Sequence, residues 1–500
     1  MTSHLKKPEL RAQTEPSHLP QSATTTRIST TRLVALIAGP LAMALLLLLP
    51  PPEAMTPEAW RLIAVTVWMV IWWLFEALPL SATALLPVVI FPLMNIMPVS
   101  DVTARYGSHL IFLFLGGFIL AAAMQKWGLH RRIALGIVAA IGTTPSRIVM
   151  GFMLATAFLS MWISNTATAV MMYAVGVSVI DFVGSQTRDH KEADRFGISL
   201  MLAIAYAASI GGVGTLIGTP PNALLASLLS ENYGIEIGFF DWMKIGIPVV
   251  LIMLPLTYVL LTRVIFPSRT LEMTSVQGVI DNEREALGPM SRAEKLVALV
   301  FGTAALLWIS RGFLGLPIGD AGIAIAAALA LFAIPISRER GFLVDWSVAR
   351  TLPWGVLLLF GGGLALAGAF EATGLAAWIG DRVGALENVP LWLLILVVAF
   401  AIIYLTEITS NTASTATFLP ILAAVAVGLQ IDVLWLTVPV ALGASMAFMM
   451  PVATPPNAII FSYEKLTLKH MAQAGFWLNI LAGLVIFAAM ELLAPLVFGI

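Results

Sequence analysis

Long apolar runs separated by short polar segments dominate the chain. A helix needs about 20 mostly apolar residues to cross a bilayer, since roughly 30 Å of hydrocarbon are covered at 1.5 Å per residue. Eleven such runs predict transmembrane helices near residues 33–50, 62–80, 82–99, 110–125, 198–230, 245–265, 296–315, 320–337, 353–371, 434–463 and 473–497.

Two further apolar stretches, residues 148–182 and 391–428, are each about 35 residues long and contain polar residues midway. This length and interruption are typical of a re-entrant hairpin, whose two helices enter and leave the bilayer on the same side. The pattern therefore predicts an all-α polytopic membrane protein with about 11 transmembrane helices and two re-entrant hairpins.

Composition supports this class and excludes several others. Hydrophobic residues make up 59% of the chain and charged residues 11%, whereas soluble proteins average about 25% charged residues. So few charges argue against a soluble enzyme, a nucleic-acid binder and a disordered chain. Cysteine is absent, and none of the six histidines lies at metal-ligand spacing from another. We therefore expect neither an enzyme nor an organic cofactor.

The distribution of basic residues predicts the orientation. If both hairpins return to their own side, 22 Lys and Arg residues lie on the side of the N-terminus and five on the other. The five are Arg61, Arg105, Lys244, Arg311 and Arg382. The positive-inside rule then places the N-terminus in the cytoplasm and the C-terminus outside the plasma (inner) membrane. Residues 1–32 are polar and basic and are interpreted as a disordered cytoplasmic arm.

Three pairs of similar segments indicate an internal repeat. Residues 114–129 (FLGGFILAAAMQKWGL) resemble 360–375 (FGGGLALAGAFEATGL) under a shift of 246, which also relates Ser-Asn-Thr at 164–166 to 410–412. Thr-Pro-Pro-Asn-Ala at 219–223 recurs at 454–458 under a shift of 235. The predicted orientation runs the two copies in opposite directions, as in many secondary transporters. The glycines in these segments are interpreted as sites of close helix packing.

The polar breaks are the candidate site. Lipid cannot satisfy backbone groups, so a helix is interrupted at membrane depth only beside protein, water or a ligand. Asn and Ser oxygens can bind a cation, amide and hydroxyl hydrogens can bind an anion, and prolines free carbonyl oxygens. No Lys, Arg or His occurs in 148–187, 196–243 or 383–464, so a bound anion would need mobile cations beside it, of which sodium is the simplest.

The paired Ser-Asn-Thr and Thr-Pro-Pro-Asn-Ala motifs and the segment 406–412 (TEITSNT) resemble the divalent anion:sodium symporter family, from about residue 33 to the end of the chain. The resemblance implies a homodimer and an elevator mechanism, with sodium as coupling ion. It implies sodium sites formed by Ser160, Ser164, Asn165 and Gly218, and by Thr406, Thr409, Asn411 and Ala453. It implies substrate contacts from Asn165, Thr166, Thr219, Asn411, Thr412, Thr454 and Pro455.

The same hypothesis divides the chain into domains. A scaffold domain comprises 33–145 and 296–390, and a transport domain comprises 146–265 and 391–500, joined by a cytoplasmic linker at 266–295. Each half of the transport domain contains one hairpin (148–182 or 391–428) and one broken helix (198–230 or 434–463).

The predicted function is sodium-driven symport of a divalent anion, with a C4 dicarboxylate such as succinate as the leading candidate. A sodium-independent dicarboxylate exchanger and a sulfate symporter remain alternatives, because amides and hydroxyls suit either dianion. An intramembrane hydrolase using Ser164 or Ser410 is a remote one, since neither hairpin contains a histidine or lysine as base. Glu407, an acid within an apolar hairpin, either acts in transport or steadies the hairpin by hydrogen bonding.

Overall fold

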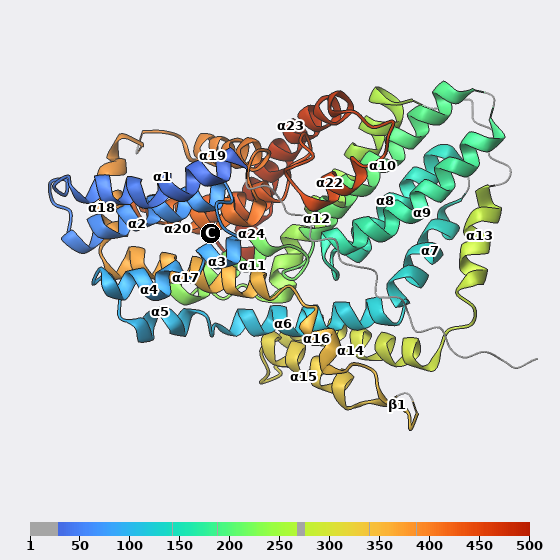
Figure 1. The fold of residues 1–500 in the computed structure, drawn as a ribbon, viewed down its shortest axis with the longest axis horizontal. Coiled ribbons are helices and arrows are strands. Elements are labelled where there is room, and N and C mark those ends of the chain that lie inside the picture. Colours follow the sequence, from blue (N-terminus) through green and yellow to red (C-terminus); the bar gives the residue numbers. More distant parts are fainter. Residues whose placement is uncertain (1–28, 143, 188, 268–275, 340, 387) are drawn as a thin grey trace, which may run out of the picture.

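The computed structural model describes residues 29–142, 144–187, 189–267, 276–339, 341–386 and 388–500. Nearly all of the arm predicted for residues 1–32 lies outside them. The described chain is a bundle of helices with one small two-stranded sheet (Figure 1). In its first half the elements are α1 (Thr30–Leu47), α2 (Pro57–Leu74), α3 (Leu80–Thr83), α4 (Leu86–Leu93), α5 (Val99–Arg105), α6 (His109–Lys126), α7 (Leu129–Ile141), α8 (Pro145–Ser160), α9 (Asn165–Gln186), α10 (His190–Gly212), α11 (Pro220–Tyr233), α12 (Phe239–Val259) and the π-helix η1 (Leu260–Ile265).

The second half begins after the predicted linker. Its elements are α13 (Val276–Ala286), α14 (Arg292–Leu314), α15 (Asp320–Ala333), β1 (Pro335–Ser337), β2 (Gly341–Phe342), α16 (Trp346–Arg350), α17 (Trp354–Ala372), α18 (Leu375–Arg382), the 3₁₀ helix η2 (Val383–Leu386), α19 (Leu391–Thr406), α20 (Asn411–Gly428), α21 (Leu434–Ala444), α22 (Pro455–Ile460), α23 (Leu468–Leu492) and α24 (Ala494–Phe498). Strands β1 and β2 pair antiparallel.

Helix ends follow local chemistry. Four helices begin with a proline at their first position, where the missing N–H costs no hydrogen bond. These prolines are Pro57, Pro145, Pro220 and Pro455.

Among the described residues, nine helices are long and apolar enough to cross a bilayer. The stretch near 82–99, expected to be one span, instead forms the short helices α3 and α4, because Pro87 cannot continue the turn before it.

All four expected interruptions are present. Helix α8 ends at Ser160 and α9 begins at Asn165, while α19 ends at Thr406 and α20 begins at Asn411. The broken spans divide into α10 with α11 and α21 with α22.

The linker contains a helix, α13, that the sequence pattern did not indicate. Its Ile280 is buried, and its Glu283 forms an ion pair with Arg131 of α7.

Close helix packing explains the glycines of the repeated segments. A β-carbon at Gly116 of α6 would lie 2.5 Å from the carbonyl carbon of Ala324 of α15, and one at Gly362 of α17 would overlap the backbone of Ala84. In Figure 1, α15 lies directly beneath α6, while α8, α9 and α10 form a separate diagonal group. The interpretation of these glycines as packing residues is confirmed at both positions.

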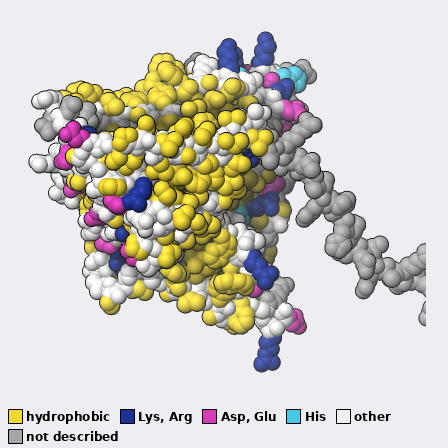
Figure 2. All heavy atoms as spheres, turned by 60° about the vertical axis from the view of Figure 1, so that its left-hand side comes forward, with side chains coloured by type: hydrophobic (Ala, Val, Ile, Leu, Met, Phe, Trp, Pro, Cys, Tyr) yellow, Lys and Arg dark blue, Asp and Glu magenta, His cyan; other side chains and the backbone are white. Residues whose placement is uncertain are grey.

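The outer surface suits lipid. Helix α1 exposes Leu33, Ile37, Leu41 and Leu45, which recur every four residues and form one apolar stripe. In Figure 2 hydrophobic side chains cover most of the face turned toward the viewer, and many of the Lys and Arg side chains lie near its edges. This arrangement is typical of a protein embedded in a bilayer.

Candidate functional site

A cavity of about 1070 Å³ brings the four polar breaks together. Its lining includes both Ser-Asn-Thr motifs, Thr219 and Pro220 of the first Thr-Pro-Pro motif and all of the second. The two copies of each motif lie more than 200 residues apart in the chain. Of the residues implied by the family resemblance, all line the cavity except Ser160 and Thr406. Those two lie just behind it and bond to residues that do.

Helix N-termini point their dipoles at this cavity. Asn165, Asn411 and Pro220, the first residues of α9, α20 and α11, all line it. Free backbone N–H groups and the positive end of the dipole favour a negatively charged guest at such ends. The cavity therefore offers partial positive charge without a basic side chain from any of the four motifs.

A cluster of oxygen atoms surrounds the Asn165 amide. Ser160 Oγ lies 2.5 Å from Asn165 Oδ1 and donates to the Ala208 carbonyl at 2.7 Å. With its nitrogen turned inward, the amide donates to Gly218 O at 3.2 Å, Ala208 O at 3.3 Å and Ser160 Oγ. With the amide oxygen turned inward, Asn165 Oδ1 faces Ser160 Oγ, Ala208 O and Gly218 O. Only the Ser160 hydroxyl then has a hydrogen to donate among these four oxygens. A bound cation would balance that second arrangement, and carbonyls freed at helix breaks are suitable ligands.

A second cluster has the same design. Thr406 Oγ1 donates to Asn411 Oδ1 at 2.7 Å and lies 3.3 Å from the Ala444 carbonyl. The shift of 246 found in the sequence relates Thr406 to Ser160 and Asn411 to Asn165. Thr409 instead directs its hydroxyl to Leu405 O at 2.9 Å and Ser414 Oγ at 2.6 Å.

The asparagines of the two Thr-Pro-Pro-Asn motifs form hydrogen bonds across the breaks in the helices. They were not singled out from the sequence. Asn222 Nδ2 donates to Gly212 O at 3.3 Å and Thr215 O at 2.8 Å. Asn457 Nδ2 donates to Ala447 O at 3.1 Å and Met450 O at 3.0 Å, positions that all correspond under the shift of 235. Both side chains are fully buried. Their recurrence in the motif was the available signal.

Glu407 is buried and forms hydrogen bonds around its whole carboxylate. Its oxygens accept from the backbone N–H groups of Phe448 at 2.6 Å, Met449 at 2.9 Å and Met450 at 3.0 Å, and from Asn479 Nδ2 at 2.8 Å. The carboxylate thus joins the end of α19 to the break after α21 and to α23. This geometry favours the steadying role of the two that the sequence left open.

Charged side chains lie at one end of the cavity. Arg32 and Glu76 line it and form a half-exposed ion pair at 3.1 Å. Just beyond Gln125, Lys126 pairs with Asp345 at 3.1 Å. Hydrogen bonds from Ser347, together with Lys126, lower the pKa of Asp345 to about 2. The sequence did not indicate that Arg32 would line the site, because it precedes the motifs by more than 100 residues.

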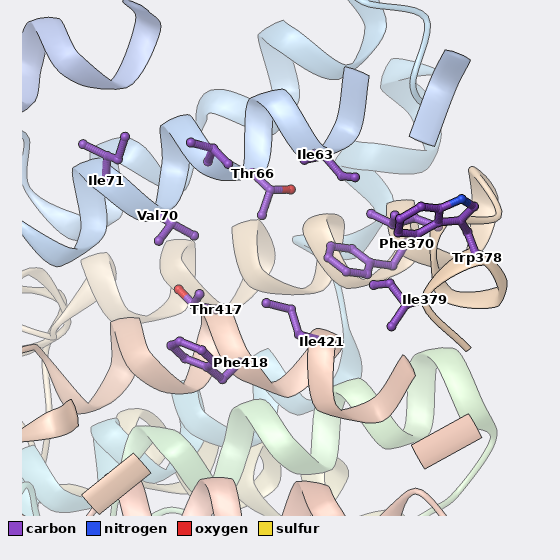
Figure 3. Close-up of a pocket in the computed structure, with 12 residues that line it drawn as sticks. Ile63, Thr66, Val70, Ile71, Phe370, Trp378, Ile379, Thr417, Phe418 and Ile421 are labelled. Atoms are coloured by element: carbon purple, nitrogen blue, oxygen red, sulfur yellow. The ribbon is translucent and has the colours of Figure 1, made fainter. Parts of the chain in front are cut away.

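A smaller cavity of about 360 Å³ lies between α2, α18 and α20 (Figure 3). Among the described residues that line it, Thr66, Thr417 and Trp378 carry polar side-chain atoms, and the others, such as Val70 and Phe418, are apolar. It carries no charge and contains none of the four motifs. It is therefore unsuited to a charged small molecule.

The fold and the cavity define a polytopic membrane transporter, and the comparisons with known proteins specify the family. Residues 29–499 match the family described as the sodium:sulfate symporter transmembrane region, and the chain belongs to this family. The chain is 42% identical to the sodium-dependent dicarboxylate transporter SdcS of Staphylococcus saprophyticus over 484 residues, 94% of this chain and 92% of that protein. Identity to its namesake from Staphylococcus aureus strain MRSA252 is also 42%, over 94% and 93% of the two chains.

A solved structure shares the fold. The YdaH transporter of Alcanivorax borkumensis superimposes with a TM-score of 0.58 at 15% identity, covering 89% of this chain and 99% of that one. Membership in a transporter family confirms the predicted class and excludes the hydrolase alternative.

Proposed function

We propose that this protein is a sodium-coupled symporter that imports a C4 dicarboxylate such as succinate. The observation that carries the proposal is the single cavity lined by both Ser-Asn-Thr motifs, which contain no basic residue, with an oxygen cluster behind each. A dianion held there by amides, hydroxyls and helix N-termini needs compensating cations nearby. The Staphylococcus relatives are named sodium-dependent dicarboxylate transporters, which supports a dicarboxylate as the substrate and sodium as the coupling ion.

The oxygen clusters are the proposed cation sites. Ser160, Ser164, Asn165 and Gly218 form the first, and Thr406, Thr409, Asn411 and Ala453 form the second. The substrate carboxylates are proposed to bind Asn165, Thr166, Thr219, Asn411, Thr412, Thr454 and Pro455. Placing the cations directly behind the asparagines lets each amide serve both ligands, so that sodium binding orders the substrate site.

An elevator movement follows from the predicted division into scaffold and transport domains with inverted repeats. Arg32, Gln125 and Thr351 line the described cavity at one end, which the predicted orientation places toward the cytoplasm. The arrangement is accordingly inward-facing, and the opposite end would open when the transport domain moves. A homodimer joined through the scaffold domains is part of the same proposal.

The membrane potential would drive uptake. If more sodium charge than substrate charge enters per cycle, each surplus positive charge gains about 2.3 kcal/mol per 100 mV of inside-negative potential. That gain corresponds to roughly fiftyfold accumulation per 100 mV.

Uptake into liposomes tests the proposal. Purified protein should accumulate labelled succinate when an inward sodium gradient is imposed, and should not when potassium replaces sodium. Accumulation indifferent to the sodium gradient would instead support the exchanger. The same assay with excess unlabelled sulfate tests the substrate: a dicarboxylate symporter should keep its uptake of labelled succinate, whereas a carrier that binds sulfate at the same site should lose it.

A further inference from the structure

A cluster of charged side chains joins three elements at the end of α6 that is remote from the mouth of the cavity. Arg105 Nη1 of α5 lies 3.6 Å from Glu231 Oε2 of α11. His109 is the first residue of α6 and lies between two carboxylates. Its Nδ1 is 3.9 Å from Glu231 Oε1, and its Nε2 is 3.8 Å from Glu236 Oε2. Ser230 Oγ donates to Glu236 at 2.7 Å. These contacts connect α5 and α6 to the C-terminal end of α11.

Arg105 and Glu231 are the better-enclosed pair of this cluster. Their side chains are 24% and 26% exposed, against 48% for His109 and 70% for Glu236. The Arg105 guanidinium also lies against α17, where a β-carbon at Gly368 would come within 3.0 Å of it. Arg105 is therefore held between α17 and α11, and partial enclosure reduces the screening of its attraction to Glu231.

Helix α11 connects this pair to the cavity. Pro220 at its N-terminus lines the cavity, and Glu231 lies 11 residues further on, about 17 Å along the helix axis. Leu224, seven residues before Glu231 and so on nearly the same face, packs near Gly363 of α17. Nearly all of the helix before Ser230 is buried. Any movement of Thr219 and Pro220 away from α17 would therefore carry Glu231 with it.

The pair has no repeat-related counterpart at the open end, where Arg32–Glu76 and Lys126–Asp345 are ion pairs between residues outside the predicted transport domain. Under the shifts of the predicted repeat, Arg105, His109 and Glu231 correspond to Thr351, Gly355 and Leu466, none of which carries a charge. Thr351 itself lines the cavity at its open end. An ionic contact thus exists where the cavity is closed, and the corresponding position at the mouth lacks one.

We propose that Arg105 and Glu231 form a latch that keeps the cavity closed at this end and must separate for it to open there. The inference rests on the proposed alternating movement. It assigns the two residues a positioning role through α11, without contact to substrate or sodium, and it makes the two orientations of the transporter unequal in energy.

Cysteine labelling tests the latch directly, because the chain has no native cysteine. In purified Leu224→Cys protein, N-ethylmaleimide should react slowly with the buried thiol. Arg105→Glu, which places a third carboxylate beside Glu231 and Glu236, should raise the labelling rate at least about threefold, the scale of a partly exposed ion pair. Glu231→Arg should do the same, and the double exchange Arg105→Glu with Glu231→Arg should return the rate toward that of Leu224→Cys alone.

Lys126→Glu is the matched control, since it reverses the charge of an ion pair at the other end of α6 and should leave labelling unchanged. Equal labelling of the parent and both single variants, or no recovery in the double exchange, would overturn the latch. If Arg105→Glu does not yield folded protein, Arg105→Gln is measured instead, and an unchanged rate there also overturns it. Sodium-driven succinate uptake by the unsubstituted protein decides the proposed function separately.

Discussion

Thr406 donates a hydrogen bond to Asn411 across the break between α19 and α20, at 2.7 Å between the hydroxyl and the amide oxygen. The bond ties the last residue of one helix to the first residue of the next. Ser160 and Asn165 stand in the same relation 246 residues earlier. A side chain at a helix end thereby orients an amide that lines the cavity.

Replacing either cavity asparagine should abolish transport. Asn165→Ala and Asn411→Ala each remove a group proposed to contact both cation and substrate. Hydrogen bonds to charged partners contribute about 1.5–3 kcal/mol. The affinity for succinate should therefore fall roughly 10- to 100-fold. Sodium-driven succinate uptake measures the loss, and Asn388→Ala, at an exposed position, is the control. Full uptake by both cavity variants would refute the site assignment.

Thr406→Val should selectively raise the sodium requirement. Valine keeps the shape but removes the hydroxyl that bonds Asn411 and faces the Ala444 carbonyl. A loss of about 0.5–1.5 kcal/mol predicts a two- to tenfold higher sodium concentration at half-maximal uptake. Thr437→Val removes a buried hydroxyl that bonds only within its own helix, and serves as control. Identical sodium curves for both variants would contradict the second cation site.

Asn457→Leu should destabilise the protein. The Asn457 amide donates to Ala447 O and to Met450 O. Met450 O also accepts from the Ala453 N–H, so leucine would leave the buried Ala447 O without a donor. Unsatisfied buried groups cost about 1–3 kcal/mol each. The thermal midpoint of the purified protein should fall clearly, and saturating sodium should not restore it. A midpoint equal to that of the parent would show that water or another donor replaces the amide.

Glu407→Gln should also lower stability, for a different reason. The carboxylate accepts from three successive backbone N–H groups and from Asn479, whereas a glutamine places an NH₂ group against some of these donors. The expected loss is on the order of 2–4 kcal/mol, seen in thermal unfolding. Asn479→Leu removes only the amide partner and should cost less. A Glu407→Gln variant as stable as the parent would argue against the steadying role.

Asp345 should not make transport pH-sensitive near neutrality. Hydrogen bonds from Ser347, together with Lys126, hold its pKa at about 2, below the ordinary value of 3.8 for an aspartate. A folded-state pKa below the unfolded value contributes stability above the unfolded pKa, and that contribution is lost as pH falls through the folded pKa. The pH profile of uptake by Asp345→Asn should therefore match that of the parent from weakly acidic to neutral pH. A profile shifted in that range would show that the carboxylate titrates there.

The sequence could predict much of the candidate site because the motifs carry their own signal. Ser-Asn-Thr inside an apolar stretch is conspicuous, and its second copy indicates a paired function. The helices do break at these motifs, and the cavity contains both copies. The short helices α3 and α4 and the linker helix α13 were not foreseen, since they depend on proline geometry and on docking against α7 rather than on span length.

Other contacts could not be read from the chain. Ala208 and Ala444 contribute only backbone carbonyls, and a carbonyl has the same identity at every residue. Glu407 had two possible roles in sequence, and only the position of the Phe448–Met450 backbone favours one of them. Arg105 and Glu231 are separated by 126 residues, with no motif to connect them.

By itself, then, the sequence determined the membrane class, the places where helices break and the family. It could do so because a bilayer forces each span to satisfy its own backbone locally, which makes every interruption visible in one dimension. Tertiary structure alone decided which oxygens gather around each asparagine, what the buried carboxylate holds and which end of the cavity is closed. Those features depend on packing between helices far apart in the chain, where sub-ångström distances rather than residue types determine the contact.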